Sequence, residues 1–168
     1  MSQFSHLNQG GEVHMVDVSG KGSNLRIARA RGFIGMAPET LAAITNDRIA
    51  KGSVLVTARL AGIMAAKKTS ELIPLCHGLA LDHVEVTFAA MSDGIAVQAT
   101  TTCNGKTGVE MEALVAASTA CLTIYDMAKA LDKAMVVSDL HLVSKEGGKS
   151  GEWRNTAPPL REWPLEWS

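Results

Sequence analysis

The feature that most constrains the fold is a pair of alternating apolar and polar segments joined by an Asp-Gly turn. The segments "ALDHVEVTFAAM" (residues 80–91) and "IAVQATTTC" (95–103) each alternate as a half-buried strand does. Asp93 and Gly94 between them predict a tight hairpin turn. The longest helical pattern follows, from about Val109 to Leu131, and its alanines predict close packing against another element.

The remaining patterns complete a recognisable order of elements. Residues 25–33 alternate as a strand, and residues 37–47 predict a helix with Pro38 in its first turn. Residues 51–73 predict one longer helix opened by Ser53, and residues 134–145 predict the last strand. The order β-α-α-β-β-α-β predicts an α+β fold with a ferredoxin-like split βαβ, an antiparallel sheet and helices packed on one face.

With 168 residues, the chain is long enough for one domain with a core and short for two. We expect an irregular N-terminal arm over residues 1–24, a single ferredoxin-like catalytic domain over 25–151, and a Trp/Pro-rich C-terminal tail over 152–168. The tail holds all three tryptophans. Three behaviours are open to it: docking on its own surface, docking on a neighbour, or remaining mobile.

Charge and composition exclude several classes of partner. A formal net charge of −1 argues against a protein that coats nucleic acid or an anionic membrane, and 4% aromatic residues leave few rings for stacking bases. No apolar run has the length of a membrane span. Three scattered cysteines and a polar N-terminus predict a cytoplasmic protein in a reducing compartment.

Two stretches contain Gly-Lys-Thr/Ser, "TTCNGKTGVEMEA" (101–113) and "EGGKSGEW" (146–153). A P-loop needs a glycine five residues earlier, where this chain has Thr100 and Val143. The first stretch fits a capping box in which Thr107 caps the helix and Glu110 reaches back. An anion at that helix start would need lysines from elsewhere, because the carboxylates of Glu110 and Glu112 crowd the position.

Two further places carry candidate chemistry. Cys76 and His77 are adjacent, but no other Cys or His falls at ligand spacing nearby, so we predict no metal and no cofactor. Asp126, Lys129 and Lys133 fall at i, i+3 and i+7 of a helix. This set is either a solvent-facing ion pair, which is the more frequent arrangement, or a general acid–base pair, for which the apolar sequence around Asp126 argues because it would bury the pair.

Five segments together resemble the cyclic pyranopterin monophosphate synthase (MoaC) family of molybdenum cofactor biosynthesis: "HMVDVSGK", "KGSVLVTARLAGIMAAKKTSELIPLCH", "KTGVEMEAL", "LTIYDMAKA" and "GGKSG". The resemblance runs in order from about His14 to Gly151. It implies a ferredoxin-like α+β fold and a homohexamer, a trimer of dimers with active sites at subunit interfaces. It also implies a lyase that converts 3′,8-cyclo-7,8-dihydro-GTP to cyclic pyranopterin monophosphate and releases diphosphate.

The resemblance also implies roles for single residues. Asp126 matches a catalytic acid–base aspartate and Lys129 its neighbouring catalytic lysine, with Lys51 as a further catalytic candidate. The implied substrate-binding residues are Leu75, Cys76, His77, Glu110, Met111 and Glu112, together with Lys67, Lys21 and Arg26 as basic residues for the triphosphate. Gly78 departs from the family's "LCHP", which puts the pose of His77 in question.

The spacing of two of these residues bears on the interface. Glu112 and Asp126 lie 14 residues apart on one predicted helix, roughly 20 Å, which is too far to act on one reacting centre. They contact opposite ends of a long substrate, or two chains each contribute one end; the alanine-rich helix favours the second. The competing hypotheses for the whole chain are a nucleotide-binding module without chemistry and an assembly scaffold.

Overall fold

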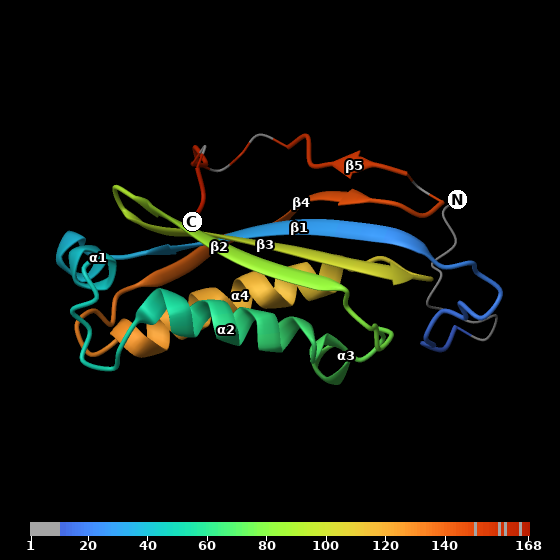
Figure 1. Cartoon of the computed structure of the whole chain (residues 1–168), viewed down its shortest axis with the longest axis horizontal. Coiled ribbons are helices and arrows are strands. Elements are labelled where there is room, and N and C mark those ends of the chain that lie inside the picture. Colours follow the sequence, from blue (N-terminus) through green and yellow to red (C-terminus); the bar gives the residue numbers. More distant parts are fainter. Residues whose placement is uncertain (1–10, 150, 158, 160, 165) are drawn as a thin grey trace.

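The computed structural model describes residues 11–149, 151–157, 159, 161–164 and 166–168 (Figure 1). The first ten residues of the predicted arm lie outside this range. The elements, in chain order, are β1 (Asn24–Gly35), α1 (Pro38–Thr45), α2 (Val54–Ala66), α3 (Thr69–Leu72), β2 (His83–Met91), β3 (Gly94–Gly105), α4 (Glu110–Ala128), β4 (Val136–Glu146) and β5 (Trp153–Arg154).

The strands form one antiparallel sheet in the order β2-β3-β1-β4-β5. The helices α2 and α4 cover one face of it (Figure 1). The predicted α+β class, the antiparallel sheet and the helices on one face are confirmed. The hairpin turn lies where the Asp-Gly pair predicts it, and a Cβ at Gly94 would collide with the Ile34 carbonyl of β1.

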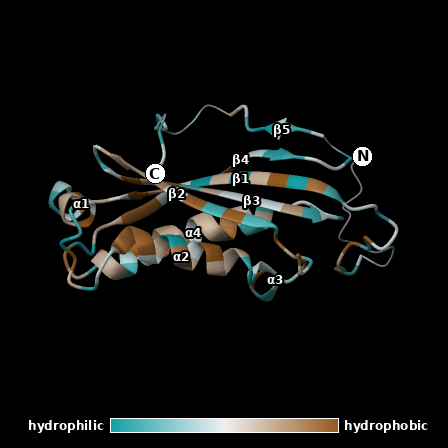
Figure 2. Cartoon of the chain, viewed as in Figure 1, coloured by the Kyte–Doolittle hydropathy of each residue, from teal (hydrophilic) through white to brown (hydrophobic). Residues whose placement is uncertain are grey.

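The two faces of β1 differ in what covers them. Ala28, Ala30 and Ile34 are buried beneath the helices. Figure 2 shows hydrophobic residues both on α2 and α4 and on the strands above them. Arg31 and Phe33 alternate with these residues and so point to the other face, which we call the open face of the sheet.

Small residues bring α2 and α4 together, as the alanines of the sequence predict. An added Cβ at Gly62 of α2 would lie 2.9 Å from the Ala116 carbonyl oxygen of α4 and 3.5 Å from the Cβ of Ala120. Ala116 and Ala120 are fully buried. Only glycine fits at this crossing, so the two helices pack backbone to backbone.

Two predicted helix limits are wrong. The single helix expected over 51–73 is two helices, because the chain leaves helical geometry at Lys68 and the buried Thr69 hydroxyl donates to the Ala66 carbonyl, 3.0 Å away. The helix expected over 109–131 ends at Ala128, so Lys133 lies beyond it, where its carbonyl accepts from the Tyr125 hydroxyl.

The described part of the C-terminal tail packs on the chain's own sheet. After β5 pairs with β4, Trp163 lies beside His141, and Arg31 lies 5.3 Å from the Trp163 ring and 5.0 Å from the Trp167 ring. Ser168 exchanges two backbone hydrogen bonds with Phe88 of β2, of 2.8 and 2.9 Å. The tail therefore crosses the open face from β4 to the far edge of β2. The boundaries of the three predicted regions stay predictions.

Candidate active site

A groove of about 610 Å³ opens where β1, β4 and the start of α4 meet. Its lining includes five basic residues and two acidic ones: Lys21, Arg26, Lys106, Lys145 and Lys149, with Glu110 and Glu146. The predicted Lys21 and Arg26 are thus brought together with three lysines that the sequence reasoning did not select. A surplus of positive charge in a concave site favours a polyanionic ligand.

Arg26 is held in place by the groove itself. Its Nε and Nη2 donate to the carbonyl oxygens of Gly105 and Lys106, at 3.3 and 3.4 Å. Gly148 packs directly on its guanidinium and leaves no room for a Cβ. Gly147 and Gly148 both have positive φ, 94° and 77°, a conformation that glycine adopts without strain. This glycine pair closes the groove over Arg26.

Glu110 does not close a capping box, so that prediction is wrong. The helix begins at Glu110 with Val109 as N-cap, and no side chain caps it. Instead the Glu110 carboxylate pairs with Lys145 Nζ at 2.8 Å, with the two side chains 27% and 35% exposed. Lys145 comes from β4, so another element does bring a lysine to the start of α4, which an anion bound there would need.

A second cavity, of about 330 Å³, adjoins the groove and shares Lys21, Thr107, Gly108 and Glu110 with it. Five predicted substrate-binding residues that line only this cavity meet there: Leu75, Cys76, His77, Met111 and Glu112. The chain therefore brings together two predicted segments that lie more than thirty residues apart, "LCH" and "EME". We call this cavity the ring pocket.

The ring of His77 has a fixed orientation despite Gly78. His77 Nε2 lies 2.8 Å from the Val16 carbonyl oxygen, which can only accept, so Nε2 carries the proton and Nδ1 stays available. Gly78 is not among the described glycines with positive φ, and a Cβ there would meet only Ser70 Oγ, at 3.6 Å. The glycine is therefore not required by sterics.

Burial changes the acidity of the ring pocket. Glu112 is 4% exposed, and desolvation, followed by the charge of Glu110, raises the pKa of its carboxyl group. Desolvation, followed by the charges of Glu112 and Glu110, raises the pKa of the Cys76 thiol. Cys76 is therefore a neutral thiol near pH 7 and a poor nucleophile.

Asp126, Lys129 and Lys51 meet at the other end of α4. Asp126 Oδ1 lies 2.7 Å from Lys129 Nζ, and its Oδ2 lies 3.4 Å from Lys51 Nζ. Lys51 also donates to the Asp126 carbonyl at 2.8 Å. The sequence pattern predicted Lys133 as the second lysine beside Asp126. In the structure that lysine is Lys51, from the loop between α1 and α2.

The expectation that this Asp–Lys pair is buried is wrong for the single chain. The side chains of Asp126, Lys129 and Lys51 are 60%, 51% and 49% exposed. Asp126 lies on the outer side of α4, whereas Ile124 and Met127 on either side of it are buried. The hydrogen bond from Lys129, followed by that from Lys51, lowers the pKa of Asp126, and Asp126 raises the pKa of Lys129.

The two sites lie at opposite ends of one helix. Glu112 and Asp126 are separated by roughly 20 Å of α4, as the spacing predicts. Lys67 is exposed at the C-cap of α2 and lines neither cavity. Among the residues that the structure describes, no group of three His, Cys, Asp or Glu side chains is placed to hold a metal ion.

Two of the three groove lysines that sequence reasoning missed come from the two stretches rejected as P-loops. Lys106 belongs to "NGKTG" and Lys149 to "EGGKSG", and both line the same groove. Both lysines stand between glycines in the sequence, and this shared pattern could have identified them as candidates for the groove. Lys145 carries no such mark, because its place depends on the pairing of β4 with β1.

Comparison with known proteins gives the family of the chain. The model of the MoaC family matches residues 15–148, which include both cavities' lining except Lys149, and also Asp126 and Lys129. The chain belongs to the MoaC family. The resemblance inferred from the five segments is confirmed.

Two MoaC relatives align over nearly their whole length. A cyclic pyranopterin monophosphate synthase of Novosphingobium aromaticivorans is 58% identical over 154 residues, which cover 92% of this chain and 98% of the relative. A protein of the same name from Desulfatibacillum aliphaticivorans is 55% identical over 157 residues, covering 92% of this chain and 99% of the relative. The tail beyond residue 148 lies outside the MoaC match.

Proposed function

We propose that this chain is an enzyme of molybdenum cofactor biosynthesis that forms cyclic pyranopterin monophosphate, the activity for which both relatives are named. Its substrate is 3′,8-cyclo-7,8-dihydro-GTP and its second product is diphosphate. Membership of the MoaC family and 55–58% identity over 92% of the chain support the activity.

The observation that carries the proposal is the basic groove joined to the ring pocket. A triphosphate needs several cations fixed before it arrives, and Arg26, Lys21, Lys106 and Lys145 line one concavity. The heterocycle needs a smaller pocket with hydrogen-bonding groups, which His77 and Glu112 supply. The substrate therefore lies with its phosphates against β1 and β4 and its ring against the start of α4.

Proton transfers dominate the ring rearrangement, and we assign them to Asp126 and Lys129 with Lys51. In one chain these groups are half exposed and about 20 Å from the ring pocket. A second copy can bring its Asp126 end over the first copy's ring pocket. That contact would bury the pair, raise the pKa of Asp126 and lower that of Lys129, toward values that suit acid–base work. Such a composite site needs at least two copies, and we propose the homohexamer, a trimer of dimers, that the family resemblance implies.

The bond changes at phosphorus balance within the substrate. A sugar hydroxyl attacks the α-phosphorus, its proton passes to a base, and the bond to diphosphate breaks. Charge develops on the leaving phosphates, and the basic groove stabilises it. The reaction needs no redox partner, and we propose that it takes place in the cytoplasm.

Two other functions make different predictions. A nucleotide-binding module would bind GTP and leave the cyclic precursor unchanged, and the Asp126–Lys129 pair, for which simple binding has no use, argues against it. A scaffold would use Asp126 and Lys129 only for stability, and their exposure of 60% and 51% argues against that.

The test is to incubate purified protein with the cyclic dihydro-GTP precursor, and to measure diphosphate and the pterin fluorescence that follows oxidation. Formation of both supports the synthase. Recovery of intact precursor from folded oligomer would overturn it, and GTP binding in the same preparation would favour the binding module.

A further inference from the structure

The strand β4 contains an extra residue at Asp139 that changes which face its later side chains occupy. Phe33 of β1 lies opposite Ser138 of β4, and Arg31 lies opposite His141. From the first pair to the second, β1 advances by two residues and β4 by three. A second irregularity follows between Arg29 and Ala30 of β1. Each inserted residue reverses the alternation of side chains beyond it.

The first insertion decides where Lys145 points. Lys145 is opposite Ala28, whose side chain is buried under the helices, and it reaches Glu110 at the start of α4. If β4 ran regularly through Asp139 and kept only its second irregularity, Lys145 would fall opposite Ile27, one position out of register, and would face away from Glu110. The basic groove would then lose one of its cations.

The insertion requires an unfavourable backbone. Asp139 has a φ of 55°, in the left-handed region that disfavours residues with a Cβ. Among the residues that the structure describes, Asp47 and Asp139 are the two non-glycine residues with positive φ. Asp139 therefore keeps this conformation only because its surroundings hold it.

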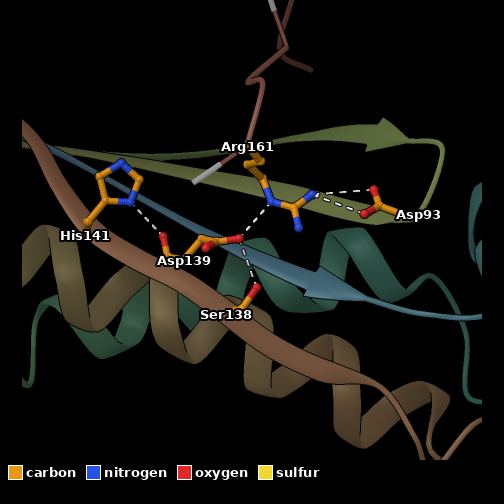
Figure 3. Close-up of polar contacts among 5 residues, drawn as sticks. All are labelled: Asp93, Ser138, Asp139, His141 and Arg161. Carbon is orange, nitrogen blue, oxygen red and sulfur yellow. Dashed lines mark hydrogen bonds and ion pairs between the residues drawn. The ribbon is translucent and has the colours of Figure 1, made fainter. Parts of the chain in front are cut away.

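Arg161 of the tail supplies the strongest of those contacts (Figure 3). Its Nε donates to Asp139 Oδ2 at 2.8 Å, and the Ser138 hydroxyl donates to the same oxygen at 3.0 Å. His141 Nδ1 donates to the Asp139 carbonyl at 2.7 Å. The side chains of Arg161 and Asp139 are 19% and 12% exposed, so solvent screens this pair little.

Arg161 is itself fixed from two other strands. Its Nη1 lies 3.4 Å from both carboxylate oxygens of Asp93, at the β2–β3 turn. Its guanidinium lies over the Phe33 ring of β1, 3.2 Å from the centroid. Figure 3 shows how Arg161 joins Asp139 of β4 to Asp93 of the hairpin turn. With the Phe33 contact, one tail residue thus ties β4 to β1 and to the hairpin turn.

We propose that Arg161 is a positioning residue, which holds the inserted residue Asp139 in β4 and thereby keeps Lys145 beside Glu110 in the groove. It lies outside the residues matched by the family model, so this device belongs to the tail. That Arg161 holds the register of β4 is inferred from the geometry alone. That Arg161 affects substrate binding rests on the proposed function.

The test measures Lys145 directly, by competitive acylation of lysines and mass spectrometry, with the exposed Lys68 as internal reference. In the wild-type oligomer the ion pair with Glu110 should slow acylation of Lys145. Arg161→Ala should speed it on the order of tenfold, because the left-handed residue loses its main support. Arg154→Ala is the matched control, since it removes an exposed tail arginine whose side chain pairs with Glu152 at 2.6 Å.

The double variant Asp139→Gly/Arg161→Ala separates positioning from general stability. Glycine adopts the left-handed conformation unaided, so this variant should restore slow acylation of Lys145. Unchanged acylation in Arg161→Ala, or fast acylation in the double variant, would overturn the proposal. In turnover assays Arg161→Ala should raise KM several-fold with kcat largely kept. An inactive wild-type protein would refute the proposed function and leave the acylation result intact.

Discussion

Lys145 of β4 and Glu110 of α4 form an ion pair of 2.8 Å that joins the sheet to the start of the helix inside the basic groove. The pair converts a carboxylate that would repel phosphate into part of a cationic wall. Removing Lys145 therefore has two effects, because it removes a cation and also exposes the charge of Glu110.

We expect Lys145→Ala to raise KM for the cyclic precursor roughly ten- to hundredfold, since hydrogen bonds to charged groups contribute about 1.5–3 kcal/mol. Glu110→Gln/Lys145→Ala should recover part of the loss, because the uncompensated carboxylate is gone. Steady-state kinetics at two salt concentrations measures both. An unchanged KM in Lys145→Ala would place the triphosphate elsewhere.

Gly148→Ala should raise KM through Arg26. The new Cβ would collide with the guanidinium, and the φ of 77° would add backbone strain of about 1 kcal/mol. Gly151→Ala is the matched control, because Gly151 has a φ of 64° but no atom within 4 Å of an added Cβ. Both variants should lose stability in urea unfolding. If Gly151→Ala raised KM equally, strain rather than contact with Arg26 would be the cause.

Asp126→Asn and Lys129→Ala should each lower kcat at least about a hundredfold, the usual contribution of a general acid or base. Both side chains are half exposed in one chain, so folding should persist. Single-turnover kinetics and size-exclusion chromatography together check this. Near-normal turnover would remove the residue from catalysis, and loss of folding would favour the scaffold.

Acid should weaken the contact between the tail and β4. The hydrogen bond from Arg161 lowers the pKa of Asp139 below its usual 3.8, so the folded state stabilises the carboxylate. That stability is fully present above pH 3.8 and is lost as the pH falls through the lower, folded-state pKa. We expect Asp139→Asn to cost about 1–2 kcal/mol of unfolding free energy at pH 7, and progressively less below pH 3.8. Urea titrations across this range test it, and a pH-independent difference would contradict it.

Glu112 should show the opposite sign. Burial raises the pKa of its carboxyl group above 4.5, so the folded state binds its proton more tightly than the unfolded state does. The ionised group destabilises the fold increasingly as the pH rises from 4.5 through the raised value. Glu112→Gln should therefore gain stability relative to wild type at pH 8 but not at pH 4. Equal differences at both values would mean that Glu112 titrates normally.

The sheet was predictable because its signals are local. Alternation in residues 80–103 and the Asp93–Gly94 turn specify a hairpin whatever the rest of the chain does. The break between α2 and α3 was not predictable, since it depends on the Thr69 hydroxyl bonding to the Ala66 carbonyl. A helical pattern of apolar residues does not reveal such a local competition.

The site divides in the same way. The segments around His77 and Glu112 were selected from their sequence and meet in the ring pocket. Lys145 was missed because its partner depends on how β4 pairs with β1: two insertions in β4 place it opposite Ala28, and no local sequence pattern reveals that register. The exposure of Asp126 was misjudged because its apolar neighbours, such as Ile124, face the sheet and core from the other side of the same helix.

The two backbone hydrogen bonds between Ser168 and Phe88 have a consequence for behaviour at high concentration. Phe88 lies on β2, one of the two outer strands of the sheet, and the bonds occupy amide and carbonyl groups that point away from β3. Unoccupied groups on such an edge serve as a template for strands of other molecules and start aggregation. By filling the middle of this edge with a residue of its own, the chain protects its solubility.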